Sequence, residues 1–217
     1  MSEYIIRRAI LADIDFLVET IIEAEKSGTE VLTYSTIFGL SYDETKRAID
    51  SMLREDIEGC ELSMSGFAIA EKNNEIAAAM CAWVEGAEGI SSTILKGNLL
   101  GFVLPAEALI KARSVSHIVA PLTIEFTPGS LCIGLVYVNA MHRGKNLVNE
   151  LLQFHIQKAV ATHSISDVCI QVFANNVAAI KAYSKVGFEY TRVCEVLTEG
   201  IDKLLPSGKK VLMTKFI

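Results

Sequence analysis

A short basic segment that follows an apolar stretch has the composition of an anion-binding site. Residues 142–146 read His-Arg-Gly-Lys-Asn, and they join the apolar stretch Leu131–Val138 to an amphipathic segment over Arg143–Ala161. A strand that leads into the N-terminus of a helix presents unpaired backbone N–H groups with partial positive charge. The arginine and lysine add formal charge, and the glycine allows close approach to the backbone. The segment therefore indicates phosphate binding, with an ordinary strand–helix turn as the alternative.

A second segment places a tyrosine at a fixed distance from a helix cap. It follows the apolar stretch Asp167–Phe173 and reads Asn-x-x-Ala-x-x-x-Tyr-x-x-x-Gly-Phe, from Asn176 through Tyr183 to Gly187. Asn is a preferred N-cap residue and Gly is preferred just beyond a helix, so a helix is predicted over Asn176–Val186. Tyr183 lies about two turns after the cap, so both side chains can point toward the same cleft.

Apolar periodicity predicts the elements that position these two segments. The predicted strands are Tyr4–Ala9, Gly66–Glu71, Ile76–Val84, Leu131–Val138, Asp167–Phe173, Phe188–Val196 and Lys210–Phe216, with an edge strand over Thr123–Phe126. The predicted helices are Ala12–Glu25, Ser41–Arg54, a short one over Ala106–Ala112, Arg143–Ala161 and Asn176–Val186. Ser41 and Glu44 have the spacing of a capping box, and Ser27–Leu40 is expected to be a flexible connection.

The order of these elements predicts one α/β (α+β) layered domain over residues 1–217. The first half reads strand, helix, helix, strand, strand, and the second reads strand, helix, strand, helix, strand, strand. Residues 86–128 separate the halves and are expected to be an insertion that contributes packed helical surface.

Composition limits the classes of protein that fit. The formal net charge is −6 at pH 7, and a general nucleic-acid binder would usually be basic, so no nucleic-acid partner is expected. No apolar run approaches the ~18 residues that span a bilayer, and the first residues lack a signal-peptide pattern. A cytoplasmic protein with no membrane partner is therefore predicted. The cysteines stand apart and neither Cys nor His spacing suggests zinc, so buried thiols and no metal are expected.

The two segments together resemble the acyl-CoA-binding core of the GNAT superfamily of N-acetyltransferases. That core carries Arg/Gln-x-x-Gly-x-Gly/Ala at the start of its central helix, where this chain has Arg143, Asn146 and Val148. The tyrosine segment matches the family's second motif at every fixed position. The resemblance covers nearly the whole chain apart from residues 86–128. It implies a single GNAT-like domain whose central mixed sheet has splayed central strands and is flanked by helices.

The resemblance also implies acetyl-CoA as a co-substrate. In the family, a central strand pairs with the amide-bearing arm of the coenzyme and the helix start binds its pyrophosphate. The coenzyme-binding residues implied here are Val136, Tyr137, Val138, Arg143, Gly144, Lys145, Asn146, Leu147, Val148, Asn176 and Tyr183. Asn146 and Val148 depart from the family pattern by adding side chains near the phosphate path, although Asn tolerates the backbone angles of a Gly position. For Asn176, helix capping is a sufficient role by itself.

The resemblance implies one catalytic role, and the chemistry of the reaction calls for a second. Tyr183 is similar to the family tyrosine that protonates the leaving thiolate, and a half-buried core tyrosine is the alternative. An amine with a pKa near ~10.4 is almost entirely protonated at pH 7, so a base or desolvation should assist its attack. Glu125 is the first candidate for that base because it precedes the central strand, with Glu85 and Tyr137 as further candidates. A solvated surface carboxylate is the alternative for Glu125.

The function predicted first is N-acetyl transfer from acetyl-CoA to a primary amine of a small molecule or peptide, by direct attack in a ternary complex. The alternative is a GNAT-fold protein that binds CoA as a sensor or structural ligand without transferase activity. An unrelated nucleotide-binding α/β domain ranks last, because the chain lacks a P-loop and a Gly-x-Gly-x-x-Gly motif. The expected partners are acetyl-CoA and an amine substrate, with a homodimer as a further expectation. No motif names the acceptor.

Overall fold

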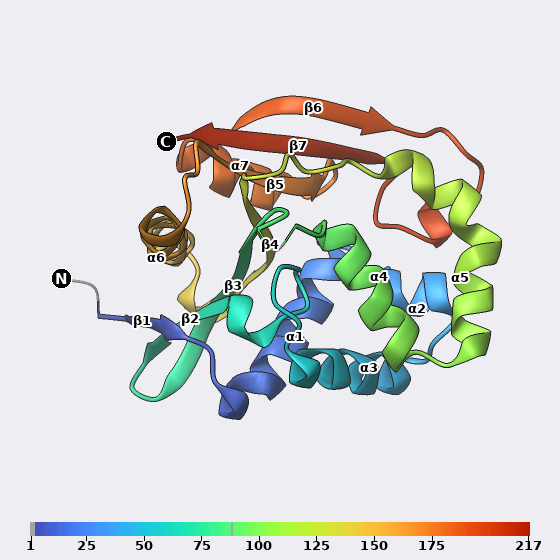
Figure 1. Cartoon of the computed structure of the whole chain (residues 1–217), viewed down its shortest axis with the longest axis horizontal. Helices are drawn as coiled ribbons and strands as arrows, with labels where there is room; N and C mark the ends of the chain where they lie inside the picture. The colour runs from blue at the N-terminus through green and yellow to red at the C-terminus, as the bar shows by residue number, and fades with distance from the viewer. Residues whose placement is uncertain (1–2, 88) are drawn as a thin grey trace.

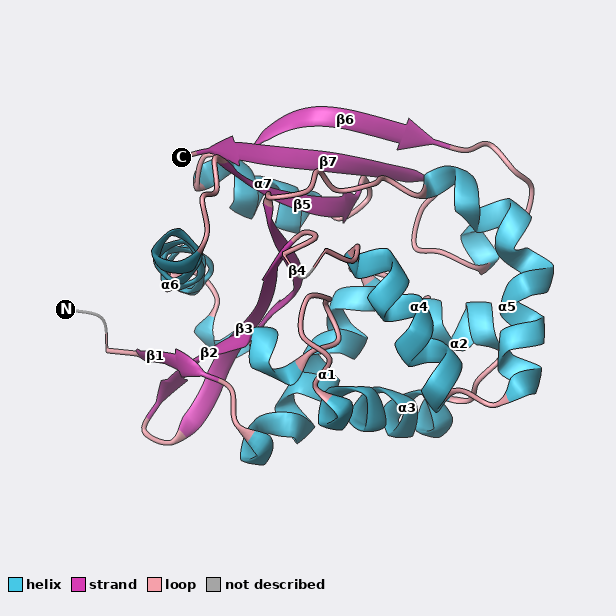
Figure 2. Ribbon diagram, viewed as in Figure 1, coloured by secondary structure: helices cyan, strands magenta, loops and turns pink. Residues whose placement is uncertain are grey.

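A seven-stranded mixed sheet organises the protein in the computed structural model, which describes residues 3–87 and 89–217 (Figures 1 and 2). The strand order is β1-β2-β3-β4-β5-β7-β6, and only the β4–β5 pair is parallel among the described strands. The strands are β1 Ile5–Arg8, β2 Phe67–Lys72, β3 Glu75–Val84, β4 Leu131–Val138, β5 Asp167–Phe173, β6 Glu189–Glu195 and β7 Lys209–Phe216. The predicted α/β class and every predicted strand except Thr123–Phe126 are confirmed.

The two central strands separate along their length. The parallel ladder between β4 and β5 joins Leu131 to Val168, Cys132 to Cys169 and Ile133 to Ile170, and it extends no further. Beyond that point β4 contains a bulge, because its register with β3 shifts and Leu135 adopts a φ of 48°. A bulge bends its strand and increases the local twist, so β4 diverges from β5. The predicted splay of the central strands is confirmed.

Helices cover both faces of this sheet. Figure 1 shows α1 to α5 on one side and α6 on the other. The helices are α1 Ile14–Lys26, α2 Thr33–Phe38, α3 Tyr42–Glu55, α4 Ser92–Val103, α5 Ala106–Val119, α6 Leu147–Thr162 and α7 Val177–Lys185. Short 3-10 helices lie at η1 Leu11–Asp13, η2 Met64–Gly66, η3 Ala120–Leu122, η4 Ala140–His142 and η5 Ile201–Lys203. Over the described residues, no helix has the length and apolarity to cross a membrane.

Alternate side chains of the central strands pack into two hydrophobic cores, one on each face of the sheet. On β3, Cys81 and Trp83 pack with α1 and α3, whereas Met80 and Ala82 pack with α6. Strands buried on both faces read as nearly continuous apolar runs, which explains the apolar composition of the chain.

Local signals at element ends behave as expected. The Ser41 hydroxyl accepts a hydrogen bond from the Glu44 N–H, and the Glu44 carboxylate accepts one from the Ser41 N–H at 2.8 Å, so the capping box is formed. Asn73 and Asn74 both have positive φ at the β2–β3 turn, which suits a tight hairpin. The Asn176 side chain caps α7 through the Ala179 N–H at 3.1 Å.

The prediction of a flexible connection over Ser27–Leu40 is wrong. That stretch contains α2, in which Tyr34 is buried and its ring stacks on Phe38 with 5.9 Å between ring centroids. Burial of an aromatic side chain stabilises a helix that is too short to persist alone.

The predicted edge strand over Thr123–Phe126 is also wrong, because that segment is held through side chains rather than a ladder. Ile124 is buried, and Phe126 packs edge-on against Trp83 with 5.6 Å between ring centroids. The Gln171 amide donates to the Ile124 carbonyl at 2.6 Å.

Two helix boundaries also differ from expectation. Pro105 is the N-cap of α5, and that helix continues to Val119 rather than ending near Ala112. α6 starts at Leu147 rather than Arg143, for a reason given below. Residues 86–128 hold α4, α5 and η3, apart from Glu88, which lies outside the described residues; their description as an insertion stays a prediction.

Candidate functional site

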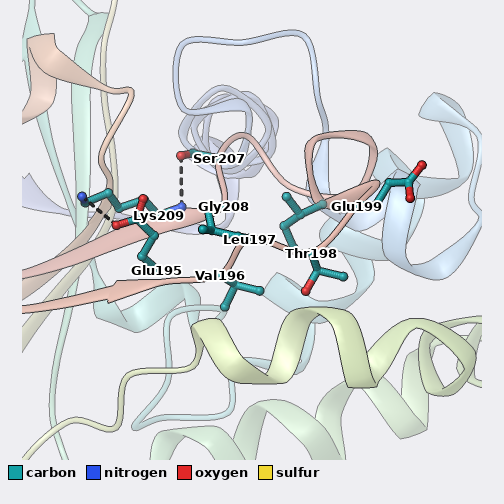
Figure 3. A pocket seen from close by; sticks show the side chains of 9 residues that line it. Glu195, Val196, Leu197, Thr198, Glu199, Ser207, Gly208 and Lys209 are labelled. Carbon is teal, nitrogen blue, oxygen red and sulfur yellow. Dashed lines mark hydrogen bonds and ion pairs between the residues drawn. The ribbon is translucent and has the colours of Figure 1, made fainter.

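A large hollow opens where β4 and β5 diverge. Its volume is about 930 Å³. The walls come from the cleft sides of β4 and β5, the start of α6, one side of α7, and residues of α1, α2 and α4. A smaller hollow of about 500 Å³ lies at the end of the β6–β7 hairpin, beside the 3.0 Å ion pair of Lys209 and Glu195 (Figure 3). Only the large cavity collects the residues that the sequence implicated, so it is the candidate site.

One end of the cavity is a loop of unpaired backbone donors. Gly144 has a φ of 77° and Asn146 a φ of 64°, so α6 can begin only at Leu147. Within the described residues, no acceptor pairs with the backbone N–H groups of residues 144–148. The positive end of the α6 dipole adds to the field of these groups. The loop can therefore bind an anionic phosphate, and Asn146 takes the left-handed conformation that the family pattern assigns to a Gly.

The basic side chains of this loop differ in position. Arg143 lines the cavity, and its Nε donates to the Val138 carbonyl at 3.2 Å. Lys145 is exposed and is not part of the cavity wall. His142 also lines the wall; its Nδ1 bonds the Tyr4 hydroxyl at 2.9 Å, and its Nε2 is buried with no partner among the described residues. Arg143 and His142 thus line the cavity beside the loop, whereas Lys145 does not.

The splayed part of β4 forms one long wall. Tyr137 and Val138 pair with Ala79 and Ala78 of β3, and none of the described strands lies against their other edge, which faces the cavity. An extended ligand with amide groups can pair with that edge as a strand would. The Tyr137 hydroxyl donates to Glu19 at 3.5 Å, and partial burial raises the pKa of Tyr137.

Tyr183 of α7 lies on the opposite wall. Its side chain is 7 % exposed, and its ring packs edge-on against Phe188 with 6.0 Å between ring centroids. Its hydroxyl has no hydrogen-bond partner in the part of the chain that the structure describes. Burial raises the pKa of Tyr183 well above its ordinary value, so the hydroxyl stays protonated and can donate.

Three further predicted residues are placed beside the loop and α7. Leu147 is buried in the core at the start of α6, and Val148 is half-buried in the cavity wall. Asn176 uses its amide oxygen to cap α7 and its amide nitrogen to donate to the Ser27 hydroxyl at 3.2 Å. Asn176 therefore ties the end of α1 to α7 at the rim of the cavity.

The three candidate bases differ in whether they line the cavity and whether they are free to accept a proton. Glu125 is exposed and does not line the cavity, because the coil before β4 directs its side chain away from the cleft. Glu85 is buried, but its oxygens accept from Trp83 Nε1 and the Ser92 N–H, both at 3.0 Å, so it fixes the start of α4. Tyr137 is the only one of the three sequence candidates in the cavity wall. Its raised pKa keeps its hydroxyl protonated, so the basic tyrosinate form is not available to accept a proton.

Sequence reasoning missed a charged group at the far end of the cavity. Glu25 of α1, Glu61, Lys96 of α4 and Lys210 of β7 all line it. Lys96 pairs with Glu61 and lies 5.6 Å from the Tyr34 ring centroid. Burial raises the pKa of Glu25 and lowers that of Lys210. Spacing could not reveal these residues, since they come from four separate parts of the chain.

Metal ligation finds no support in the described residues, which hold no group of three or more His, Cys, Asp or Glu side chains that could bind an ion. The cysteines are free thiols; Cys132 and Cys169 lie across the β4–β5 ladder with 3.4 Å between sulfur atoms.

Comparison with known proteins gives one family. The model of the acetyltransferase (GNAT) family matches residues 38–188. A search of curated proteins found no significant match. Among solved structures, an N-acetyltransferase from Staphylococcus aureus Mu50 superimposes with a TM-score of 0.65 and 16 % identity, over 97 % of this chain and 99 % of that one.

Two further solved structures are similar in fold. The Drosophila melanogaster polyamine N-acetyltransferase, which catalyses formation of N-acetylagmatine, has a TM-score of 0.57 and 13 % identity, over 99 % of this chain and 100 % of its own. The ribosomal-protein-S18-alanine N-acetyltransferase from Escherichia coli has a TM-score of 0.53 and 12 % identity, over 99 % and 94 %.

Proposed function

Because the chain belongs to the GNAT family of acetyltransferases, we propose that it transfers an acetyl group from acetyl-CoA to a primary amine of a small molecule or peptide. The loop of unpaired N–H groups at residues 144–148 carries this proposal, because it lies beside the open edge of β4. A ligand with phosphates at one end and amides along its length matches both features.

The same two features support one direction for the bound coenzyme. Its pyrophosphate would accept hydrogen bonds from the loop and would be attracted by the positive charge of Arg143. Its amide-bearing arm would run back along β4 from Val138 toward Gly134. Four residues of strand span about 13 Å. The thioester would then lie near the β4 bulge, where Glu61 approaches: its Cβ lies 3.6 Å from the position of a Cβ added at Gly134.

The reaction needs one proton acceptor and one proton donor. The amine nitrogen bonds to the carbonyl carbon, the carbon–sulfur bond breaks, and one proton leaves the amine. The cavity offers the carboxylates of Glu25 and Glu61 to receive that proton. Burial raises the pKa of Glu25, which makes it a stronger base than an ordinary glutamate.

Tyr183 supplies the donor in this proposal. The thiolate that leaves can take a proton from the Tyr183 hydroxyl, which lines the same cavity and has no other partner among the described residues. Attack occurs directly in a ternary complex, because both ligands have room in one cavity of about 930 Å³.

Release of CoA thiol tests the proposal. The protein is incubated with acetyl-CoA and a panel of free amino acids, polyamines and short peptides, and acetylated products are identified by mass spectrometry. Thiol release that depends on an amine and yields its acetylated product is the expected result. Bound acetyl-CoA without amine-dependent release would contradict transfer and would leave a GNAT-fold protein that only binds the coenzyme.

A further inference from the structure

The end of the cavity remote from the phosphate loop contains charges of both signs. Glu25 comes from α1, Glu61 from the connection between α3 and η2, Lys96 from α4 and Lys210 from β7. The charges of Glu61, Lys96 and Lys210 all act on the Glu25 carboxylate, so the four groups share one region of the cavity. Half-buried charges of this kind are costly unless each has a partner.

Two of these charges already neutralise each other. Lys96 forms an ion pair with Glu61, and its ammonium lies over the Tyr34 ring. Glu23 also lines the cavity, and it pairs with Lys26 at 2.7 Å. These pairs are complete without a ligand.

The other two charges have no ion pair with any described residue. The Thr33 hydroxyl lies beside Glu25 and donates to its backbone carbonyl at 3.5 Å. The Lys210 ammonium lies over the Phe173 ring, 4.9 Å from its centroid, with no carboxylate within ion-pair distance. Burial removes water from both groups, and it raises the pKa of Glu25 and lowers that of Lys210. One carboxylate and one ammonium therefore face the same space without contacting each other.

A ligand that carries both an ammonium and a carboxylate complements this arrangement. We propose that the acceptor is an amine of amino-acid type, with its ammonium toward Glu25 and its carboxylate toward Lys210. This inference rests on the proposed function, since the amine held at Glu25 is the one that is acetylated. Before attack, the ammonium gives one proton to the Glu25 carboxylate. The neutral nitrogen then bonds to the acetyl carbon as the carbon–sulfur bond breaks, its second proton passes to Glu61, and the leaving thiolate takes a proton from Tyr183.

The same charges disfavour a polyamine. A second cation on the acceptor would face Lys210 and also Lys96, and like charges in a partly buried site repel strongly. An acceptor carboxylate would instead gain a charge-assisted hydrogen bond from Lys210. The carboxylate of the acceptor is therefore the feature that should govern selectivity.

Matched pairs of acceptors isolate that feature. Arginine and agmatine, leucine and isoamylamine, and lysine and cadaverine differ within each pair only by the α-carboxylate. Two readouts are used for every compound: kcat/KM from CoA thiol release with acetyl-CoA, and Kd from calorimetric titration into protein saturated with CoA. The preferred pair is the one whose carboxylated member has the highest kcat/KM. In that pair, the carboxylated member should have a kcat/KM at least tenfold higher and a Kd at least tenfold lower than its decarboxylated partner.

Substitution of Lys210 links the preference to the proposed contact. Lys210→Met should reduce the discrimination within the preferred pair to less than about threefold. Lys209→Met is the matched control, because Lys209 immediately precedes Lys210 in β7 and pairs with Glu195 outside the large cavity. The Lys209→Met variant should keep the full preference for the carboxylated acceptor. Lys210→Gln replaces Lys210→Met if the latter does not give a folded protein by melting curve.

The outcomes separate this inference from the proposed function. Equal or better use of the decarboxylated members would overturn the inference while leaving acetyl transfer intact, and so would a preference that survives in Lys210→Met. Absence of thiol release with every amine would contradict the proposed function; the calorimetric arm then decides the inference alone. Failure of every carboxylated amine to bind the CoA-saturated protein would overturn it.

Discussion

Ile133 of β4 pairs with Ile170 of β5, and these are the last residues at which the two central strands share a ladder. One residue further along β4, Gly134 already lines the cavity, as do all the remaining residues of that strand. The end of this pairing is what converts a closed sheet into a binding cleft, because each strand keeps its outer partner while its inner edge becomes available to a ligand. The cleft is thus part of the sheet itself rather than a space between loops.

Reversal of charge at Arg143 should weaken coenzyme binding without unfolding the protein. The guanidinium lines the cavity beside the loop of free N–H groups, and the residue is exposed. A lost charge-assisted contact and a new repulsion should raise the Kd for acetyl-CoA roughly 10- to 100-fold in Arg143→Glu. Titration calorimetry measures this. Arg47→Glu, which makes the same change on the exposed side of α3, is the control, and equal affinities of the two variants would remove Arg143 from the site.

The backbone conformation at Asn146 should determine whether the loop can form. Its φ of 64° suits Gly and Asn but is costly for a β-branched residue, by about 1–2 kcal/mol. Asn146→Val should therefore weaken acetyl-CoA binding by about tenfold, whereas Asn146→Gly should bind at least as well as the wild type. Both variants are titrated with acetyl-CoA. If the Val variant binds like the Gly variant, the left-handed turn is not needed for the ligand.

Removal of the Tyr183 hydroxyl should slow catalysis with little effect on stability. Tyr183→Phe keeps the buried ring and removes a hydroxyl that bonds to no described residue, so the free energy of unfolding should change by less than about 0.5 kcal/mol. Loss of a general acid should lower kcat by roughly 10²-fold at unchanged acetyl-CoA affinity. Steady-state kinetics are compared with Tyr190→Phe, an exposed tyrosine of β6. An unaltered kcat, with chemistry shown to be rate-limiting, would leave Tyr183 a packing residue.

His155 should make the fold sensitive to mild acid. It is buried in α6, its Nε2 bonds the Met80 carbonyl at 3.0 Å, and burial lowers its pKa from 6.5 to about 4. Between these two pH values the unfolded chain binds a proton that the folded chain does not. The free energy of unfolding therefore falls as the pH drops through this window, by up to about 3 kcal/mol.

The variant His155→Gln isolates this effect, because glutamine can keep a hydrogen bond to the Met80 carbonyl but cannot titrate. Its unfolding free energy, measured with denaturant at several pH values across the window, should depend less on pH than that of the wild type. Parallel curves for the two proteins would show that other groups cause the acid sensitivity.

Features set by neighbouring residues could be predicted from the sequence. The Asn176 cap and the capping box at Ser41 each depend on a few adjacent residues, and each is found where it was expected. The loop of Arg143 and Asn146 is likewise local, since helix start and backbone angles are decided within a few positions.

Features set by tertiary packing could not be predicted in this way. Leu135 adopts a positive φ that no sequence signal suggests, because the bulge is stabilised by the pairing of β4 with β3. Glu125 was a candidate base through its position before β4, but sequence position does not say which way a coil residue points. Glu25 and Lys210 face the same cavity only because the end of α1 and the start of β7 both lie beside it.

Direct titration with acetyl-CoA tests the central claim, that the coenzyme binds in the cleft between β4 and β5. Calorimetry should show one molecule bound per chain, and ligand at about 100 times its Kd should add about 2.7 kcal/mol to the free energy of unfolding, seen as a raised Tm. Absence of both binding heat and a Tm shift at millimolar acetyl-CoA, in protein shown to be folded, would contradict the account.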